Sequence, residues 1–425
     1  MIKQRLSYVN AATLLLAIAI MAFHRGGDIR IYWLPAASLI IIAPAVMLIS
    51  ASLGHIRMRP NARTDIPLLA FLGWCGFTWF ASVNREQTAF EVYRLSIAVM
   101  AYMIAAYGIS GNGPRLAFLV SIFVMALLEA FYGIYSYLSG SLLFDPSWID
   151  MPLSKSAVTG TYLNHNHFAG LMYMSALSGL GLVGYAWSVK GDWSQRLSRA
   201  GLPLIGCAVL SAALVLSVSR GGWISMAFGV MIFLLSLFLS SRPRLFMVLG
   251  GALLAVIILS VVVIGIDKGE VGEQASTLQA LSSLPEDLSA SQRISIWKST
   301  VEMIKDHPVT GTGWGTFRSV FPMYRQDRLF LGVRFAHNDY LQFASETGIT
   351  GILLFLVFLA FLLYEGSLSI MRDKGNSLNW IYPGIVAAIS AVLVHELVDF
   401  NLMVPSNSIL FFSLAGLIAG RKEKK

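Results

Sequence analysis

The sequence predicts an all-α, polytopic membrane protein with about 12 transmembrane helices and a large loop that contains short amphipathic helices. The 425 residues are 56% hydrophobic and only 13% charged, and the mean hydropathy is +0.68. This composition is too apolar and too poor in charge for an ordinary soluble domain. In addition, apolar runs of membrane-spanning length recur along the whole chain, and the connections between them are alternately rich and poor in basic residues.

The apolar runs define the expected spans in order. An α-helix needs roughly 20 mostly apolar residues to cross a bilayer. The candidates occupy residues 8–23, 31–53, 66–83, 92–110, 114–138, 168–187, 202–218, 223–240, 245–266, 341–364, 380–400 and 407–420. The first run follows Lys3 and Arg5, as in a signal peptide, but no small-residue cleavage site follows it. We therefore expect an uncleaved span.

The basic residues predict the orientation, because Lys and Arg accumulate in the cytoplasmic loops of membrane proteins. Seventeen of them lie in the two termini and in the connections on the same side as the termini. Six lie in the connections on the opposite side, with the long loop after the ninth run left out. This difference predicts that both termini are cytoplasmic. It also explains the net charge of +8 without a nucleic-acid partner. Residues 1–425 then form a single membrane domain with two long outer connections, 139–167 and 267–340.

The longer outer connection contains features that hydrophobicity does not explain. Residues 291–305 repeat apolar side chains at helical spacing, which predicts an amphipathic helix on the membrane face. The GTGWGTF run at 311–317 resembles a phosphate-binding loop but lacks its GK[ST] ending. We expect these glycines to form a tight turn that leaves Trp314 and Phe317 to meet lipid or sugar.

Two arginines on the outer side are candidates for binding an anion. Arg220 lies between two apolar runs with only Gly221 and Gly222 after it, so its guanidinium stays at the membrane boundary. A charge there is costly, and it either binds a partner such as phosphate or reaches lipid headgroups. Arg293 opens the amphipathic helix, where it either presents a bidentate fork to a diphosphate or lies on a solvated face.

His337 is the candidate general base. It stands with Asn338 and Asp339 at the predicted start of the tenth span. Histidine titrates near neutrality, so it can accept a proton from a hydroxyl and later release it. The alternative is a helix cap without a chemical role.

The NHNHFAG run at 164–170 opens the sixth span. His165 and His167 stand without cysteine and with few carboxylates nearby, which makes a poor metal site. We expect Asn164 and Asn166 to act there as hydrogen-bonding amides.

Four further ionisable groups fall within or beside predicted spans: Glu129, His395, Glu396 and Asp399. Ionisable groups inside a membrane indicate a functional role by default. For Glu396 and Asp399, ion pairing with the outer arginines is an equally open interpretation.

Together these segments resemble the bacterial O-antigen ligase and O-antigen polymerase family of membrane glycosyltransferases. The similar segments are NHNHFAG at 164, SRGGW at 219, QRISIWKS at 292, GTGWGTF at 311, HNDYLQFASETGITG at 337 and, more weakly, DFNLMVPSN at 399. They occur in the order typical of the family. The family commonly has proline between the two asparagines, where this chain has His165.

The resemblance implies transfer of a glycan from an undecaprenyl diphosphate carrier to a sugar hydroxyl at the periplasmic face of the bacterial inner membrane, without a metal or another cofactor. Arg220 and Arg293 would bind the diphosphate and stabilise the leaving group. His337 would act as general base, with inversion at the anomeric carbon. The supporting residues would be Asn164, Asn166, Asn338, Asp339 and Asp399.

Several acceptors remain open. A ligase would pass the finished chain to the lipid A core, and a polymerase would pass a growing chain to a new lipid-linked repeat. Transfer to protein is disfavoured, because protein-glycosylating relatives tend to have longer C-terminal regions. Outside the family, the alternative is a lipid or polysaccharide transporter without catalytic activity, although the sequence lacks the internal duplication of many transporters.

Overall fold

The computed structural model describes residues 2–27, 30–54, 58–142, 157–240, 290–325, 332–371 and 377–420, and these residues form helices and connections without a strand. The α-helices are α1 (Ile2–Ala22), α2 (Arg30–Ser52), α3 (Ala62–Phe77), α4 (Arg85–Met103), α5 (Asn112–Ser139), α6 (His165–Ser188), α7 (Trp193–Leu216), α8 (Arg220–Leu239), α11 (Ala290–Asp306), α12 (Phe317–Tyr324), α13 (Asp339–Met371), α14 (Ile381–His395) and α15 (Pro405–Ala419). The short 3-10 helices are η1 (Arg25–Gly27), η2 (Thr78–Phe80), η6 (Ser377–Trp380) and η7 (Asn401–Met403), and η3 (Ile104–Gly108) is a short π-helix.

The all-helical, multi-pass architecture is confirmed. Among the described residues, nine helices are long and apolar enough to cross a membrane. α15 is apolar but shorter, and α3 has 16 residues. Every predicted span except 245–266, which lies outside the described residues, contains one of these helices. The count of about twelve spans therefore stays a prediction.

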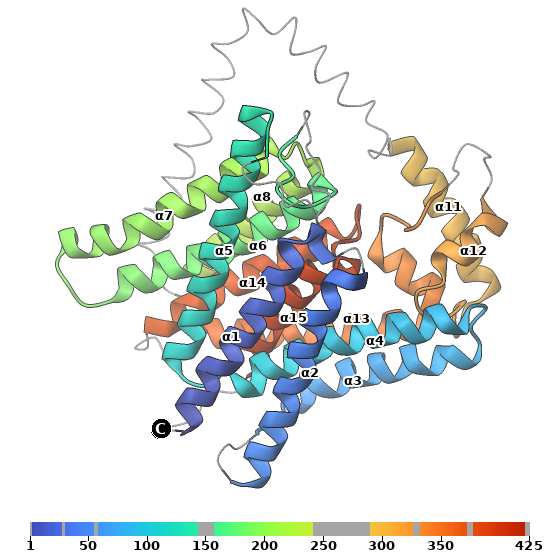
Figure 1. Cartoon of the computed structure of the whole chain (residues 1–425), viewed down its shortest axis with the longest axis horizontal. Coiled ribbons are helices and arrows are strands. Elements are labelled where there is room, and N and C mark those ends of the chain that lie inside the picture. Colours follow the sequence, from blue (N-terminus) through green and yellow to red (C-terminus); the bar gives the residue numbers. More distant parts are fainter. Residues whose placement is uncertain are drawn as a thin grey trace, which may run out of the picture.

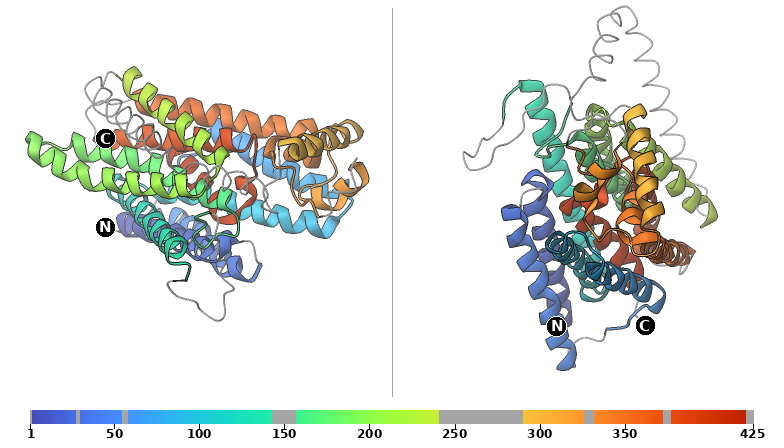
Figure 2. Two further views of the ribbon diagram at one scale, coloured as in Figure 1. Left: turned by 90° about the horizontal axis from the view of Figure 1, so that it is seen from above. Right: turned by 90° about the vertical axis from the view of Figure 1, so that its right-hand side faces the viewer.

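The connections gather at two opposite ends of the helix bundle, as alternating helix directions require. At the first end, hydrogen bonds run from Thr161 to Ala22, from Val83 to Thr312 and from Asn338 to Leu397. At the second end, they run from Asn61 to Ala419, from Arg115 to Gly420 and between Ser7 and Ser110. Figure 2 shows α11 and α12 at one end and the start of α1 and the end of α15 near the other.

The direction of α8 bears on the predicted ninth span. α8 runs antiparallel to α14, because Gly221 lies against His395 at the first end and Gly229 lies against Ala387 further along. The chain thus leaves α8 towards the second end and returns to the described part in α11 at the first end.

α6 and α14 form the centre of the bundle (Figure 1), and they are the most buried of the candidate spans. Their backbones approach closely at two glycines. A Cβ on Gly181 would lie 2.8 Å from the carbonyl oxygen of Ile381, and one on Gly384 would lie 2.5 Å from that of Leu177. Transmembrane helices associate through such close van der Waals packing, since lipid offers no hydrophobic driving force between them. The two glycines therefore allow α6 and α14 to pack closely in the half of the bundle that lies away from the first end.

The predicted glycine turn is confirmed, and it docks on a kink in α13. The amide of Gly313 donates to the carbonyl of Glu346 (3.0 Å), and that of Ile349 donates to Pro308 (2.8 Å). The kink is at Gly348, with φ 67° and ψ −176°. The turn and the first part of α13 thus form one hydrogen-bonded unit.

The expectation that Trp314 and Phe317 meet lipid or sugar is wrong, because both side chains are buried. Trp314 packs edge-on against Phe343 at 4.9 Å, and Phe317 stacks on Phe321 at 5.0 Å. The cause is Glu346, whose carboxylate accepts from the amides of Gly315 (2.8 Å) and Phe317 (3.0 Å) and so folds the turn inward.

The predicted amphipathic helix at 291–305 is confirmed as α11. Its apolar residues divide between two surroundings. Ile296 and Met303 are buried in a cluster with Phe317 of α12, whereas Ile294 and Val301 are exposed. The helix is therefore held by protein on one side, and only part of its apolar surface is free to lie on a membrane.

Candidate functional site

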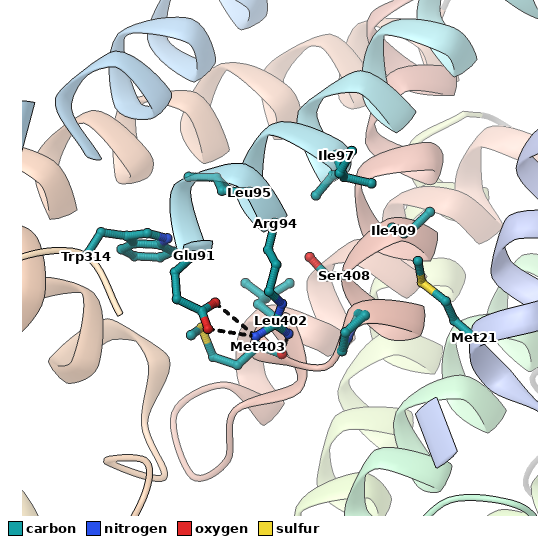
Figure 3. A pocket seen from close by; sticks show the side chains of 12 residues that line it. Met21, Glu91, Arg94, Leu95, Ile97, Trp314, Leu402, Met403, Ser408 and Ile409 are labelled. Atoms are coloured by element: carbon teal, nitrogen blue, oxygen red, sulfur yellow. Dashed lines mark hydrogen bonds and ion pairs between the residues drawn. The ribbon is translucent and has the colours of Figure 1, made fainter. Parts of the chain in front are cut away.

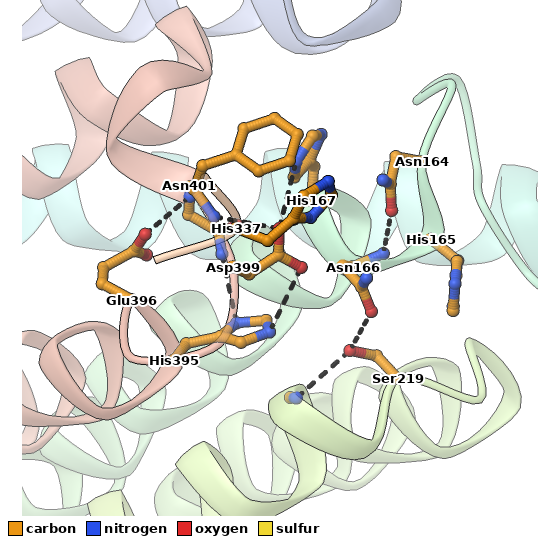
Figure 4. A network of polar contacts seen from close by, with 12 residues as sticks. Asn164, His165, Asn166, His167, Ser219, His337, His395, Glu396, Asp399 and Asn401 are labelled. Carbon is orange, nitrogen blue, oxygen red and sulfur yellow. Dashed lines mark hydrogen bonds and ion pairs between the residues drawn. The ribbon is translucent and has the colours of Figure 1, made fainter. Parts of the chain in front are cut away.

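A polar site lies at the first end of the bundle, where α6, α8 and α13 begin and α14 ends (Figure 4). Its centre is Asp399, whose side chain is 1% exposed. His167 Nε2 lies 3.8 Å and His337 Nδ1 lies 4.0 Å from Asp399 Oδ1, and His395 Nε2 lies 3.8 Å from Oδ2. A buried carboxylate needs such partners to offset its lost hydration. The structure therefore gathers three imidazoles around one carboxylate.

His337 occupies an unusual backbone conformation beside Asp399. Its φ of 50° lies in the left-handed region, which non-glycine residues adopt rarely and which often marks a functional position. The cap of α13 is Asn338 and not His337, because Asn338 Oδ1 accepts from the amide of Leu341 (3.0 Å). The His337 side chain is 15% exposed, so it can meet a substrate.

His395 is the most enclosed of the three imidazoles. Its Nδ1 lies 3.3 Å from the Tyr173 hydroxyl and 3.2 Å from Asn401 Nδ2. Since the amide nitrogen of Asn401 can only donate, Nδ1 acts as acceptor and the ring proton belongs on Nε2. That N–H points to Asp399 Oδ2 and fixes one side of the carboxylate.

Phe400 separates the other two imidazoles. The His167 ring meets it edge-on at 4.6 Å, and the His337 ring does so at 4.9 Å. Phe335 stacks on the same phenyl group at 4.2 Å. Both imidazoles are therefore held against an aromatic wall with their nitrogens turned to Asp399.

The His-x-His pair of the NHNHFAG run divides between two places. His167 joins the site, whereas His165 Nδ1 lies 2.7 Å from the carbonyl oxygen of Ser217 at the end of α7. Among the residues that the structure describes, no group of three or more His, Cys, Asp or Glu side chains is arranged to hold a metal ion. Glu129 lies elsewhere and accepts from the amide (2.6 Å) and hydroxyl (2.8 Å) of Thr161, so it anchors the connection leading into α6.

Asn164 and Asn166 are hydrogen-bonding amides at the start of α6, as predicted. Asn164 Oδ1 caps the helix by accepting from the Asn166 amide at 2.7 Å. Asn166 Oδ1 accepts from the Ser219 hydroxyl at 2.7 Å, and Ser219 Oγ accepts from the Gly222 amide at 3.1 Å. This chain of bonds ties the start of α6 to the start of α8.

Arg220 is the first residue of α8, and its side chain is exposed. The next residue, Gly221, lies against the His395 ring, since an added Cβ would be 2.7 Å from Nε2. A cation at a helix N-terminus is unfavourable, because the helix dipole already makes that end positive. The positive end of the helix dipole and the guanidinium together favour an anion at this position.

Arg293 approaches the site from α11. Its Nε atom is buried without a hydrogen-bond partner among the described residues, and its charge lies close enough to His395 to interact with it electrostatically. A buried guanidinium nitrogen without an acceptor is costly. The arrangement therefore favours an oxyanion near Arg293, on the same side of the site as His395.

Two buried carboxyl groups hold the segment that carries Asp399. Glu396 Oε2 accepts from the Asn401 amide at 2.7 Å, and Asp339 Oδ2 accepts from the Leu402 amide at 3.2 Å. Burial, and then the neighbouring Asp339, raise the pKa of Glu396 well above its ordinary value. Glu396 thus positions the backbone after α14 through its bond to the Asn401 amide.

An apolar pocket lies on the other face of this segment (Figure 3). It is lined by Met21, Glu91, Arg94, Leu95, Ile97, Ala98, Trp314, Leu402, Met403, Pro405, Ser408 and Ile409. Arg94 pairs with Glu91 at 2.9 Å and donates to the Met403 carbonyl at 2.8 Å. The imidazoles are not among its lining residues, so the pocket is separate from the polar site.

The fold and site define a multi-pass α-helical membrane protein with a buried carboxylate, three imidazoles and two arginines at one end of the bundle. Residues 205–356 match a family model described as O-antigen ligase, a stretch that includes Arg220, Arg293 and His337. This match supports assignment of the chain to the O-antigen ligase and polymerase family. No curated protein matches the chain.

Proposed function

We propose that this protein transfers a glycan from an undecaprenyl diphosphate carrier to a sugar hydroxyl at the periplasmic face of the bacterial inner membrane. The family match supports a function of the O-antigen ligase or polymerase type in general. The proposal adds the donor and an acceptor that is either the lipid A core or a lipid-linked glycan. Both termini would then lie in the cytoplasm.

The proposed reaction exchanges one bond for another at the anomeric carbon. The acceptor oxygen forms a bond to this carbon, the bond to the diphosphate oxygen breaks, and its electron pair leaves with undecaprenyl diphosphate. Attack opposite the leaving group gives inversion. Arg220, with the positive end of α8, and Arg293 would bind the diphosphate and stabilise the charge that develops on it.

His337 would take the proton of the acceptor hydroxyl. Its Nδ1 faces Asp399 Oδ1 at 4.0 Å, so Nδ1–H would point to the carboxylate and Nε2 would accept the proton. Asp399 would then stabilise the imidazolium, as a carboxylate does beside a catalytic histidine. Catalytic hydrogen bonds are often long without substrate and shorten in the complex.

The observation that carries the proposal is the pairing of a partly exposed His337 with the buried Asp399 beside the start of α8. A hydroxyl deprotonated at His337 would lie at the same end of the bundle as the two arginines. A transporter would need neither a base nor this pairing.

The test uses purified protein in proteoliposomes that contain a lipid-linked glycan donor and an acceptor. We expect His337→Ala to lower the transfer rate by about 10²- to 10⁴-fold, and Arg220→Ala or Arg293→Ala by about 10²- to 10³-fold. Arg85→Ala is the matched control, since Arg85 lies over the Trp79 ring (5.0 Å) away from the imidazoles. Unchanged transfer in both His337→Ala and Arg220→Ala would disprove the catalytic proposal.

The acceptor is decided by the surface polysaccharide of a deletion strain on a gel. Full-length chains left on the carrier indicate a ligase, whereas a core bearing single repeats indicates a polymerase. Movement of the lipid-linked glycan across the membrane without transfer would indicate the transporter alternative.

A further inference from the structure

The backbone of Ala336, directly before His337, makes two hydrogen bonds to side chains of different helices. Its carbonyl accepts from Trp297 Nε1 of α11 at 3.0 Å, and its amide donates to Gln342 Oε1 of α13 at 3.0 Å. Ala336 itself is fully buried. The amide and the carbonyl belong to the two peptide planes on either side of the Ala336 Cα, so both planes are held, and the second plane restricts the left-handed conformation that His337 adopts next in the chain.

Gln342 is itself fixed by the glycine turn. Its Nε2 donates to Glu346 Oε1 at 3.3 Å, and the Glu346 carboxylate accepts from the amides of Gly315 and Phe317. Gln342 and Glu346 are buried. The Ala336 amide is therefore bonded to a rigid unit and not to a mobile side chain.

Trp297, whose indole N–H donates to the Ala336 carbonyl, lies on α11 together with Arg293. The two residues are four positions apart on α11, which places them on one face, one turn from each other. Ile296 and Ala336 also belong to one apolar cluster. The indole bond therefore sets where the Arg293 guanidinium stands relative to His337.

We infer that Trp297 and Gln342 are positioning residues, which hold the diphosphate-binding Arg293 and the base His337 at a fixed separation through the backbone of Ala336. The inference rests on the proposed function, because it takes the roles of Arg293 and His337 from there. Neither positioning residue touches the reacting atoms. Each acts through the placement of its neighbour, and misplacement of a reacting group by about 1 Å can cost on the order of 10²-fold in rate.

The main test is Trp297→Phe, which keeps an aromatic ring and removes the indole N–H together with part of the ring volume. We expect the glycan transfer rate to fall about tenfold, as the loss of one hydrogen bond predicts, with a raised KM for the lipid-linked donor. Trp74→Phe is the matched control. It removes an indole bond of 2.8 Å to the Thr347 carbonyl on the same α13 helix, and we expect less than a twofold change in rate.

A second measurement separates positioning from general destabilisation. In an Arg293→Ala background, Trp297→Phe should not raise the donor KM further, because the group it positions is gone. Gln342→Leu should lower the rate about tenfold with an unchanged KM for the donor, since it acts on His337.

The outcomes distinguish this inference from the proposed function. If Arg293→Ala leaves transfer unchanged, the proposed role of Arg293 fails. If Arg293→Ala impairs transfer but Trp297→Phe behaves like Trp74→Phe, the proposed function stands and the positioning inference is overturned. An additive rise in donor KM in the Trp297→Phe, Arg293→Ala double variant also overturns it.

Discussion

Replacement of Gly348 by alanine tests whether the glycine turn and α13 form one unit. Gly348 has φ 67° and ψ −176°, a region that is essentially restricted to glycine and costs other residues about 1 to 3 kcal/mol. An added Cβ would also lie 2.1 Å from the Val309 carbonyl oxygen and 2.3 Å from its carbon. Because these are backbone atoms, they cannot turn aside as a side chain would. The overlap adds about 1 to 3 kcal/mol.

The two terms give a loss of about 2 to 6 kcal/mol for Gly348→Ala. Unfolding entropy is about 2.1 cal/mol/K per residue, so a chain of 425 residues loses about 1 °C of Tm per kcal/mol. We therefore expect Tm to fall by about 2 to 6 °C. The hydrogen bond from Ile349 to Pro308, on the next residue, should be the first to break.

The assay is thermal unfolding of the purified protein in detergent, followed by intrinsic fluorescence. Gly73→Ala on α3 is the control, because a Cβ at Gly73 meets nothing within 4 Å and alanine favours a helix by up to about 1 kcal/mol. Its Tm should stay constant or rise slightly. Equal Tm values for Gly348→Ala and Gly73→Ala would refute the reasoning, since the strain and the backbone overlap would then have no cost.

Two further predictions concern the polar site. Ser219→Ala removes the 2.7 Å bond to the buried Asn166 Oδ1 and should destabilise the protein by about 1 to 3 kcal/mol. If the fall in Tm of the Ser219→Ala, Asn166→Ala double variant equals the sum of the falls in the two single variants, the two residues do not share a bond. Glu396→Gln keeps an acceptor for the Asn401 amide and should fold. The raised pKa of Glu396 contributes stability below the ordinary value of 4.5, and this contribution is lost as pH rises towards the folded-state pKa. The Tm of the Glu396→Gln variant should therefore rise relative to the Tm of the unmodified protein as pH rises above 4.5. A Tm difference between the two proteins that does not change with pH would exclude a raised pKa of Glu396.

Local pattern sufficed for features that depend on neighbouring residues in sequence. The helical spacing at 291–305 predicted α11, and the polar residues at the start of the tenth span predicted where α13 begins. The asparagines of the NHNHFAG run could be identified as hydrogen-bonding amides at the start of α6, and Asn164 does cap that helix over two residues. Periodicity also located the helices, although it could not fix how many of them cross a membrane.

The sequence could not show what depends on helices meeting in space. His167 and His395 lie more than 200 positions apart, and only the packing of α6 against α14 brings both to Asp399. The burial of Trp314 depended on Glu346, whose carboxylate turns the loop inward. The four-residue spacing of His395 and Asp399 was visible, but it could not identify the imidazole from α6 that completes the cluster.

The segment after α14 borders both the polar site and the apolar pocket. Phe400 contacts two of the imidazoles, and Leu402 and Met403 line the apolar pocket. Arg94 holds the segment at the Met403 carbonyl, and Asp339 holds it at the Leu402 amide. A ligand that filled the apolar pocket would therefore contact the segment that presents Asp399 at Leu402 and Met403, without contacting the three imidazoles.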